Sequence, residues 1–372
     1  MDRRRLTEEL KAEAARLGFD LTGATPAVAP AGIGRLEQWL AGGFAGEMQY
    51  LAERAEVYRH PRYILDGVKG VLMLGMNYHT VEPAESGSGQ GVVARYAWGR
   101  DYHELIRDKL NRLAEFHRGL LPDAGVRGVV DTAPLMEREF AARAGLGWIG
   151  RNTMLLNEHF GSWIVLAALL TTEELAYDES VDADLCGSCT ACLDACPTGA
   201  LVEPYRVDAR KCLSYLTIEL RGPIPAELRP GLGHQLFGCD CCQRVCPHNQ
   251  DAPTTSEESF QPGPCMNPVD LAELFAIDDA AFRGRFRDTP LWRPRRPGIL
   301  RNAATVLGNR PHEAAVPALV RGLNDDEPLV RAASAWALGQ HKSNAARNAL
   351  RERMDVETDV EVRTEIESSM CQ

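Results

Sequence analysis

The sequence predicts three structural parts: an α/β domain, a cysteine-rich domain and a C-terminal array of paired helices. The 372 residues are too many for one ordinary core. Nine of the eleven cysteines lie between residues 186 and 246, and a motif repeats within the last 75 residues. We therefore place the α/β domain at 1–175, the cysteine-rich domain at 176–260, a connector rich in Arg and Pro at 261–297 and the helical array at 298–372.

The first domain is predicted from apolar runs that alternate with helical patterns. The runs at 68–76, 126–130 and 163–170 are short and apolar, which suits buried strands. Between them, residues 108–120 and 135–144 have apolar side chains at helical spacing. Strands that alternate with helices are typical of an α/β domain.

The composition favours a cytoplasmic protein that uses its cysteines for metal binding or redox chemistry. No apolar run approaches the roughly 18 to 20 residues that a membrane span needs. The first 16 residues are charged and helical in pattern, so we expect neither a membrane anchor nor a secretory signal. Eleven cysteines without such a signal argue against a disulfide framework.

The spacing of the cysteines predicts iron–sulfur clusters in a ferredoxin-like domain. Four of them form the run C-x-x-C-x-x-C-x-x-x-C-P: Cys186, Cys189, Cys192 and Cys196. An incomplete second copy and one upstream cysteine supply four more: Cys212, Cys239, Cys242 and Cys246. In two-cluster ferredoxins the last cysteine of each run binds the other cluster. This rule predicts two 4Fe-4S clusters, one bound by Cys186, Cys189, Cys192 and Cys246 and the other by Cys196, Cys212, Cys239 and Cys242.

Tetrahedral zinc is the main alternative for these cysteines, because C-x-x-C pairs also suit zinc. Zinc needs four thiolates in two close pairs, whereas this domain offers eight in crossed order with two C-x-x-x-C-P endings. We therefore expect clusters. Cys241 would fit the second run only with an altered spacing, so we expect that it is not a cluster ligand.

A repeated motif predicts the helical array. Residues 300–308 (LRNAATVLG) recur at 330–339 (VRAASAWALG) and in part at 362–365, with an offset of 30 to 32 residues. Residues 314–323 supply an antiparallel helix between the first two copies. This pattern resembles HEAT-type repeats, in which helix pairs stack to bury a shared seam.

The connector before the repeats is a basic segment in a chain whose formal net charge is −11. Seven arginines lie between residues 283 and 301, against the single acid Asp288. Such a segment suits contact with the phosphates of a nucleic acid. The alternative is a solvated linker that is merely rich in Arg and Pro.

Several segments together resemble epoxyqueuosine reductases over almost the whole chain. They are the cysteine array, the repeats and residues 48–51, 96–103, 131–134, 147–153, 212–219 and 238–247. The resemblance implies a cobalamin-dependent oxidoreductase, related to reductive dehalogenases, that converts epoxyqueuosine to queuosine at the wobble position of tRNA. It also implies that an external low-potential donor feeds electrons through both clusters. We then expect the connector, through Arg293, Arg295 and Arg296, and the repeats to hold the backbone of the tRNA, whose anticodon stem-loop carries epoxyqueuosine.

Asp131 is the predicted proton donor. It follows the apolar run 126–130, at the strand end where α/β sheets usually bind their ligands. The resemblance implies that it is the general acid, a role that would require burial to raise its pKa. The alternative is that Asp131 caps a helix.

The resemblance further implies that the first domain binds cobalamin through the edge of the corrin ring. The sequence has no D-x-H-x-x-G motif, so no protein imidazole is expected on the cobalt. Arg54 has an alternative reading as a surface helix residue, and Cys241 stands where the family usually has Asp. The expected contacts are Arg54, Asp131, Arg151, Asn152, Ser162, Ser214 and Cys241.

Two other functions are compatible with the cysteine array. A corrinoid reductive dehalogenase would share the chemistry, but the repeats and the lack of an export signal argue against it. A non-enzymatic electron carrier of ferredoxin type would leave residues 1–175 without a purpose.

Overall fold

The computed structural model describes residues 1–181 and 184–371. Residues 182–183, in the predicted cysteine-rich domain, and residue 372, at the end of the predicted repeats, lie outside the described residues. The chain forms two compact units, each assembled from three separate segments. The first unit comprises Met1–Thr80, Tyr102–Ala209 and Cys241–Ser259, and the second comprises Val81–Asp101, Arg210–Asp240 and Phe260–Gln372.

The first unit is built on a four-stranded sheet with the strand order β1-β2-β7-β4. The strands are β1 (Leu21–Pro26), β2 (Gly70–Asn77), β4 (Val126–Val130) and β7 (Ile164–Thr171). The three runs predicted as strands are thereby confirmed to within two residues at each end. Every residue of β2 is buried, because this strand lies in the interior of the sheet with both faces covered.

The sheet is antiparallel, which corrects the expectation of an α/β domain. β7 lies between β2 and β4 and pairs antiparallel with both, and β1 pairs antiparallel with β2. Apolar runs indicate that a strand is buried but not the direction of its neighbours. Asp131 does follow β4 directly, although the rule that places ligands at the carboxyl edge of parallel sheets does not apply here.

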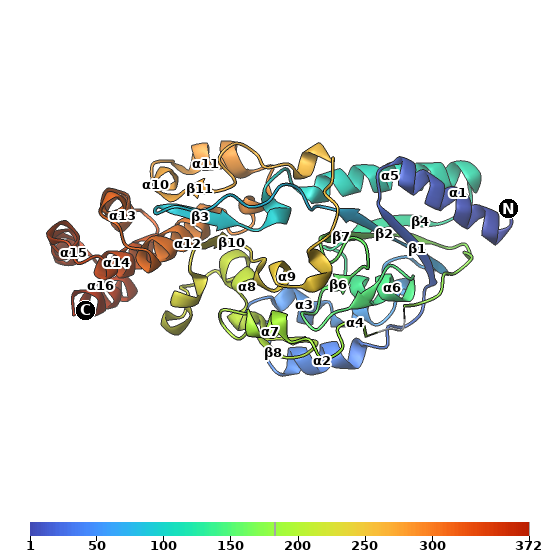
Figure 1. Ribbon diagram of the computed structural model, residues 1–372, viewed down its shortest axis with the longest axis horizontal. Helices are drawn as coiled ribbons and strands as arrows, with labels where there is room; N and C mark the ends of the chain where they lie inside the picture. Colours follow the sequence, from blue (N-terminus) through green and yellow to red (C-terminus); the bar gives the residue numbers. More distant parts are fainter. Residues whose placement is uncertain (182–183, 372) are drawn as a thin grey trace. The chain divides into compact units, whose positions relative to one another are not determined.

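Helices cover both faces of this sheet. α1 (Arg3–Arg16) and α5 (Tyr102–Leu120) lie on one face, and α6 (Glu137–Arg143) lies on the other (Figure 1). Successive strand residues serve opposite faces, so alternate residues of β2 join the core beneath α6. α5 begins six residues before the predicted helix at 108–120, and α6 lies within the predicted helix at 135–144.

Shorter elements complete the first unit. β5 pairs antiparallel with β6, and β8 pairs antiparallel with β9. In neither described range, 1–181 or 184–371, is a helix both long and apolar enough to cross a membrane. The shorter elements are α2 (Ile33–Ala41), α3 (Gln49–Glu53), α4 (Ala55–Tyr58), η1 (Pro61–Tyr63), β5 (Trp148–Ile149), β6 (Leu155–Leu156), α7 (Ala191–Asp194), β8 (Leu201–Glu203), β9 (Arg206–Val207), α9 (Cys241–Arg244) and η6 (Pro247–Asn249).

The second unit combines a small sheet with the C-terminal helices. β3 (Gln90–Val93) pairs parallel with β10 (Gln235–Phe237) and antiparallel with β11 (Val269–Asp270). One apolar core extends from this sheet into the last helix. The helices are α8 (Leu213–Ile218), α10 (Leu271–Leu274), α11 (Asp279–Phe286), α12 (Arg295–Asn309), α13 (Val316–Leu323), α14 (Pro328–Gln340), α15 (Asn344–Val356) and α16 (Val360–Met370).

The predicted repeats form stacked helices. The motif copies lie in α12, α14 and α16, and the predicted helix at 314–323 is α13 preceded by a 3-10 turn. The glycine that closes each full copy permits close packing with the next motif helix. A Cβ atom at Gly308 would lie 3.0 Å from Cα of Ala337, and one at Gly339 would lie 2.7 Å from Cβ of Ser369. Larger residues at these two positions would push the repeats apart.

The arginine of each full motif copy has a structural role. Arg301 is 1% exposed and donates to three carbonyl oxygens in the segment 216–222. Arg331 donates to the two carboxylate oxygens of Glu357 at 2.8 and 3.0 Å. Arg301 therefore does not belong to an exposed basic patch, although the arginine count of the connector included it.

Candidate active site

Asp131 is oriented by two side chains from the start of α5. The hydroxyl of Tyr102 donates a hydrogen bond to Oδ2 of Asp131, and Nε2 of His103 lies 2.7 Å from Oδ1. The two rings stack with their centroids 4.2 Å apart. α6 has Met136 at its N-cap, so Asp131 is not the cap of that helix. Tyr102 and His103 were not predicted as site residues, although both lie in the family-like segment 96–103.

The burial that a raised pKa of Asp131 would require is not observed, because its side chain is 40% exposed. A second carboxylic acid lies deeper beside it. Burial raises the pKa of Glu137, and the negative charge of Asp131 adds to that effect. Burial also raises the pKa of Tyr58 to about 12, with the negative charge of Glu137 as the next contribution. Near this site, Glu137 is therefore the carboxylic acid whose pKa burial raises.

Arg54 lies between α3 and α4 and contacts the segment that follows Asp131. Its Nη1 donates to the carbonyl oxygen of Thr132 at 3.2 Å. The side chain is exposed, as its alternative reading as a surface helix residue requires, but this contact places it at the candidate site.

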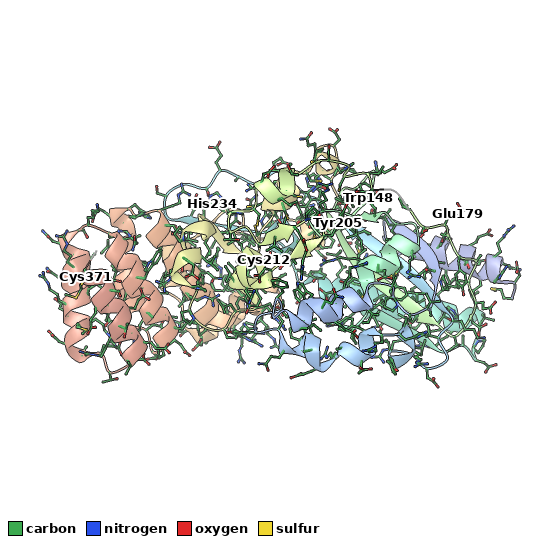
Figure 2. The ribbon with its side chains drawn as sticks, turned by 90° about the horizontal axis from the view of Figure 1, so that it is seen from below. Trp148, Glu179, Tyr205, Cys212, His234 and Cys371 are labelled. Atoms are coloured by element: carbon green, nitrogen blue, oxygen red, sulfur yellow. The ribbon has the colours of Figure 1, made fainter. Side chains whose placement is uncertain are left out.

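The first unit brings together the four cysteines predicted to bind one cluster. Cys246 is 8% exposed, packs with Trp148 and Leu156, and has Cys186 against it. Burial raises the pKa of the Cys246 thiol, and the charges of Cys186 and Cys189 raise it further. Burial likewise raises the pKa of the Cys192 thiol, with contributions from Cys186 and Cys246. Figure 2 labels Trp148, which packs with Cys246.

Cys246 thus lies near Cys192, from which 53 residues separate it in the sequence, as the crossed ligand order requires. The packing of α7 against α9 brings the two segments together. The ligand assignment itself stays a prediction.

The four cysteines predicted for the other cluster are divided between the units. Cys196 and Cys242 belong to the first unit, whereas Cys212 and Cys239 belong to the second. Sγ of Cys196 accepts a hydrogen bond from the amide of Ala200 at 3.2 Å. Cys212, which Figure 2 labels, immediately precedes α8. Across the two described ranges, no three His, Cys, Asp or Glu side chains converge closely enough to hold a single metal ion.

Two of the predicted cobalamin contacts have a buried hydrogen-bond donor that no described residue accepts from. Asn152 is 4% exposed, and its Nδ2 has no hydrogen-bond partner among the described residues. Nε of the neighbouring Arg151 is likewise buried without a partner, while its Nη1 donates to the carbonyl oxygen of Cys189 at 3.2 Å. These donors fit a ligand whose polar groups would face them, because a buried donor without a partner is costly.

The remaining predicted contacts differ in their burial and in the hydrogen bonds that they already make. Ser162 is 1% exposed, and its Oγ lies 3.0 Å from Nε2 of Gln243 and 2.9 Å from Nδ2 of Asn249. Its hydroxyl is therefore already used within the protein. Ser214 is half-buried in α8, and Cys241 is the first residue of α9.

The cluster cysteines and the oriented carboxylic acid define an iron–sulfur oxidoreductase. The family model for a 4Fe-4S double cluster binding domain matches residues 185–249, and the model for HEAT repeats matches residues 294–371. Both matches confirm the predicted character of these regions. A third model, Epoxyqueuosine reductase QueG, DUF1730, matches residues 59–132.

Relatives that align with most of the chain carry the same family name. The epoxyqueuosine reductases of Pseudomonas aeruginosa and Escherichia coli K12 are 41% and 38% identical to this chain. Each alignment covers 91% of this chain, and they cover 96% and 90% of the relatives, respectively. The chain belongs to the epoxyqueuosine reductase family.

Solved structures agree with this assignment. The crystal structure of an epoxyqueuosine reductase with an epoxyqueuosine-modified tRNA-Tyr stem loop has a TM-score of 0.92 and 32% identity, with 98% of each chain covered. The Bacillus subtilis epoxyqueuosine reductase, with its catalytic loop swung out of the active site, has a TM-score of 0.91 and 31% identity, again with 98% of each chain covered.

Proposed function

We propose that this enzyme reduces epoxyqueuosine to queuosine in tRNA with the help of cobalamin and two 4Fe-4S clusters. The observation that carries the proposal is the carboxylic acid of Asp131, which Tyr102 and His103 orient in the same unit that gathers four cluster cysteines. We assign cobalamin binding to residues 1–175, the clusters to 176–260, the connector to 261–297 and the repeats to 298–372.

The chemistry needs both features. Conversion of an epoxide to an alkene consumes two electrons and two protons, and it releases the oxygen as water. Two 4Fe-4S clusters can pass on electrons one at a time from an external low-potential donor. Cobalamin, when bound, supplies a strongly reducing cobalt centre beside the substrate.

The chain's own residues would orient the cofactor and supply protons. Asn152 and Arg151 offer the buried donors for the polar edge of the corrin ring. Arg54, Asp131, Ser214 and Cys241 complete the proposed set of contacts, whereas the hydroxyl of Ser162 is used by Gln243 and Asn249. Asp131 would give a proton to the departing oxygen, and Tyr102 and His103 would stabilise the carboxylate that remains.

Fewer arginines of the connector are proposed to contact tRNA than the arginine count indicated. Arg296 is 15% exposed and forms an ion pair with Asp325 at 2.5 Å, so it is structural. Arg293 is 53% exposed, although it pairs with Glu219 at 3.0 Å, and the guanidinium of Arg295 lies 4.0 Å from the centre of the Trp292 ring. Together with Arg221, these two arginines line a pocket of about 380 Å³. We therefore propose that Arg293 and Arg295, but not Arg296, contact tRNA phosphates.

The D131N variant tests the proposal. Asn keeps the shape of the side chain but has no acidic proton, so single-turnover reduction of an epoxyqueuosine stem-loop RNA should fall by about 10² to 10⁴. Cluster content and RNA affinity should match the wild type. D123N is the matched control, because Asp123 is an exposed acid of the same unit that lies away from the site. A D131N variant with the wild-type rate would show that the proton comes from another group.

A further inference from the structure

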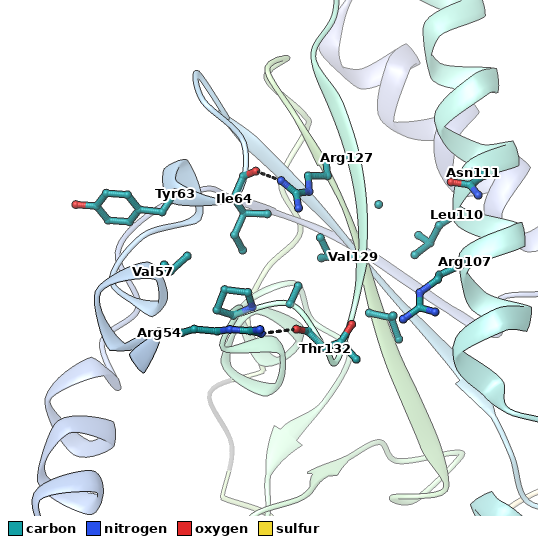
Figure 3. A pocket seen from close by; sticks show the side chains of 14 residues that line it. Arg54, Val57, Tyr63, Ile64, Arg107, Leu110, Asn111, Arg127, Val129 and Thr132 are labelled. Atoms are coloured by element: carbon teal, nitrogen blue, oxygen red, sulfur yellow. Dashed lines mark hydrogen bonds between the residues drawn. The ribbon is translucent and has the colours of Figure 1, made fainter. Parts of the chain in front are cut away.

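A pocket in the first unit lies beside Asp131. It has a volume of about 520 Å³, within the range typical of ligand sites. One wall is α5, another is the segment that contains α4 and η1, and β4 runs between them (Figure 3). Residues 132–134, which directly follow Asp131, complete the lining. β4 is the outer strand of its sheet, so the pocket lies along an open strand edge.

The pocket is strongly basic. Three of its fourteen lining residues are arginines, and no Asp or Glu is among these described residues. Arg107 is exposed and makes no hydrogen bond or ion pair within the described ranges. Arg127 uses one nitrogen, Nη1, to donate to the carbonyl oxygen of Ile64 at 2.8 Å and keeps its other donors available. Arg54, the third, donates to Thr132.

The same helix face supplies this charge and orients Asp131. His103, Arg107 and Asn111 are spaced four residues apart and therefore lie along one face of α5. His103 contacts Asp131, whereas Arg107 and Asn111 line the pocket one and two turns further along. Gly128 of β4 permits this arrangement, since a Cβ atom there would lie 2.8 Å from Cβ of Leu110.

Guanidinium groups without a carboxylate partner suit a phosphate, which accepts two hydrogen bonds from one arginine. The tRNA substrate of the proposed reaction carries a phosphate on either side of the nucleotide that must reach Asp131. Fixing such a phosphate would set the position of that nucleotide without reading its base.

We infer that Arg107 and Arg127, which lie on opposite sides of β4 (Figure 3), bind phosphodiester groups of the RNA next to the nucleotide that is reduced. This inference rests on the proposed function, because it takes the RNA chain as the source of the phosphate. The alternative is that these arginines only keep the open edge of β4 from pairing with another strand.

Variants R107Q and R127Q and their combination test the inference. Affinity for an epoxyqueuosine stem-loop RNA should fall roughly tenfold for each variant at low salt, because each loses a charge-assisted contact. The slope of log K against log salt should flatten by about 0.7 to 1 per variant. KM should rise, and the single-turnover rate at saturating RNA should fall by a smaller factor. Inorganic phosphate should compete with RNA for the wild type and much less for the double variant.

R112Q is the matched control, because Arg112 is an exposed residue of α5 outside the pocket. If R107Q and R127Q keep the wild-type salt slope, or if R112Q flattens it equally, the inference is overturned. Should phosphate bind while RNA affinity stays unchanged, the pocket holds a free anion and the inference again fails. A wild-type enzyme that binds the RNA without reducing it would instead refute the proposed function. R127K, which keeps the charge, should retain most of the affinity and so separates charge loss from misfolding.

Discussion

Replacement of Glu357 by Gln should destabilise the repeats in a way that depends on pH. The Glu357 side chain is fully buried and accepts hydrogen bonds from Arg331 and Arg353 and from the amides of Thr358 and Asp359. Burial alone would raise the pKa of Glu357, but these hydrogen bonds outweigh it and hold the pKa at about 2, against an ordinary 4.5. A difference of roughly 2.5 between the two values corresponds to about 3 kcal/mol of folding free energy.

The sign follows from the lowered pKa. The stabilisation is fully present above pH 4.5 and is lost as the pH falls towards 2, with about 2 kcal/mol gone by pH 3. At pH 7, E357Q should therefore lower the free energy of unfolding by about 3 kcal/mol and the Tm by about 6 to 12 °C. Towards pH 3 the gap between variant and wild type should narrow.

Thermal unfolding followed by circular dichroism between pH 7 and pH 3 measures both effects. E352Q is the matched control, since Glu352 is an exposed acid on the adjacent helix α15 and should change the Tm very little. A gap between E357Q and wild type that is absent at pH 7, or that does not narrow with falling pH, would refute this account of the ion cluster.

Three further predictions concern the partners of Asp131, the cluster ligands and the arginines of the connector. Y102F should lower the single-turnover rate several-fold and shift its pH profile while cobalamin still binds, because it removes a hydrogen bond that positions Asp131; an unchanged profile would remove Tyr102 from the site. C241S should keep about eight irons per chain while C242S loses iron, as measured by iron and sulfide analysis, and a C241S variant that loses a cluster would overturn the ligand assignment. Joint replacement of Arg293 and Arg295 by Gln should weaken RNA binding and flatten its salt dependence, whereas an unchanged slope would place both arginines outside the interface.

The cluster region could be predicted largely from local spacing. Three predicted ligands of the first cluster, Cys186, Cys189 and Cys192, lie within a short run of chain, and the crossing rule supplied their distant partner, Cys246. The structure brings Cys246 to Cys186 and Cys192. Local spacing was sufficient here because the backbone turns within a run point its thiolates towards a common cluster.

The surroundings of Asp131 could not be predicted in the same way. Its position after a strand followed from the apolar run, but the partners Tyr102 and His103 lie about 30 residues earlier, on a helix that the sequence pattern started too late. The antiparallel sheet that brings α5 to this position also has no signature in the apolar pattern.

The count of arginines in the connector failed to predict which of them are exposed, for a related reason. The seven arginines of the connector form one basic segment in the sequence, yet Arg296 pairs with Asp325 and Arg301 is buried against main-chain carbonyl oxygens. Both sets of partners come from other parts of the fold, so a sum over neighbouring residues cannot reveal them. The pocket beside Asp131 is the opposite case. Its arginines, Arg107 and Arg127, lie apart in the sequence and line the same pocket only in the folded chain.

The most direct test of the central claim is the conversion of epoxyqueuosine in a stem-loop RNA, followed by mass spectrometry of the released nucleosides. Enzyme reconstituted with iron, sulfide and cobalamin and supplied with a low-potential reductant should yield queuosine, which lacks one oxygen atom relative to epoxyqueuosine. Omission of cobalamin should abolish the conversion. If the fully reconstituted enzyme has reducible clusters but leaves epoxyqueuosine unchanged, or converts it equally well without cobalamin, the proposed function is contradicted.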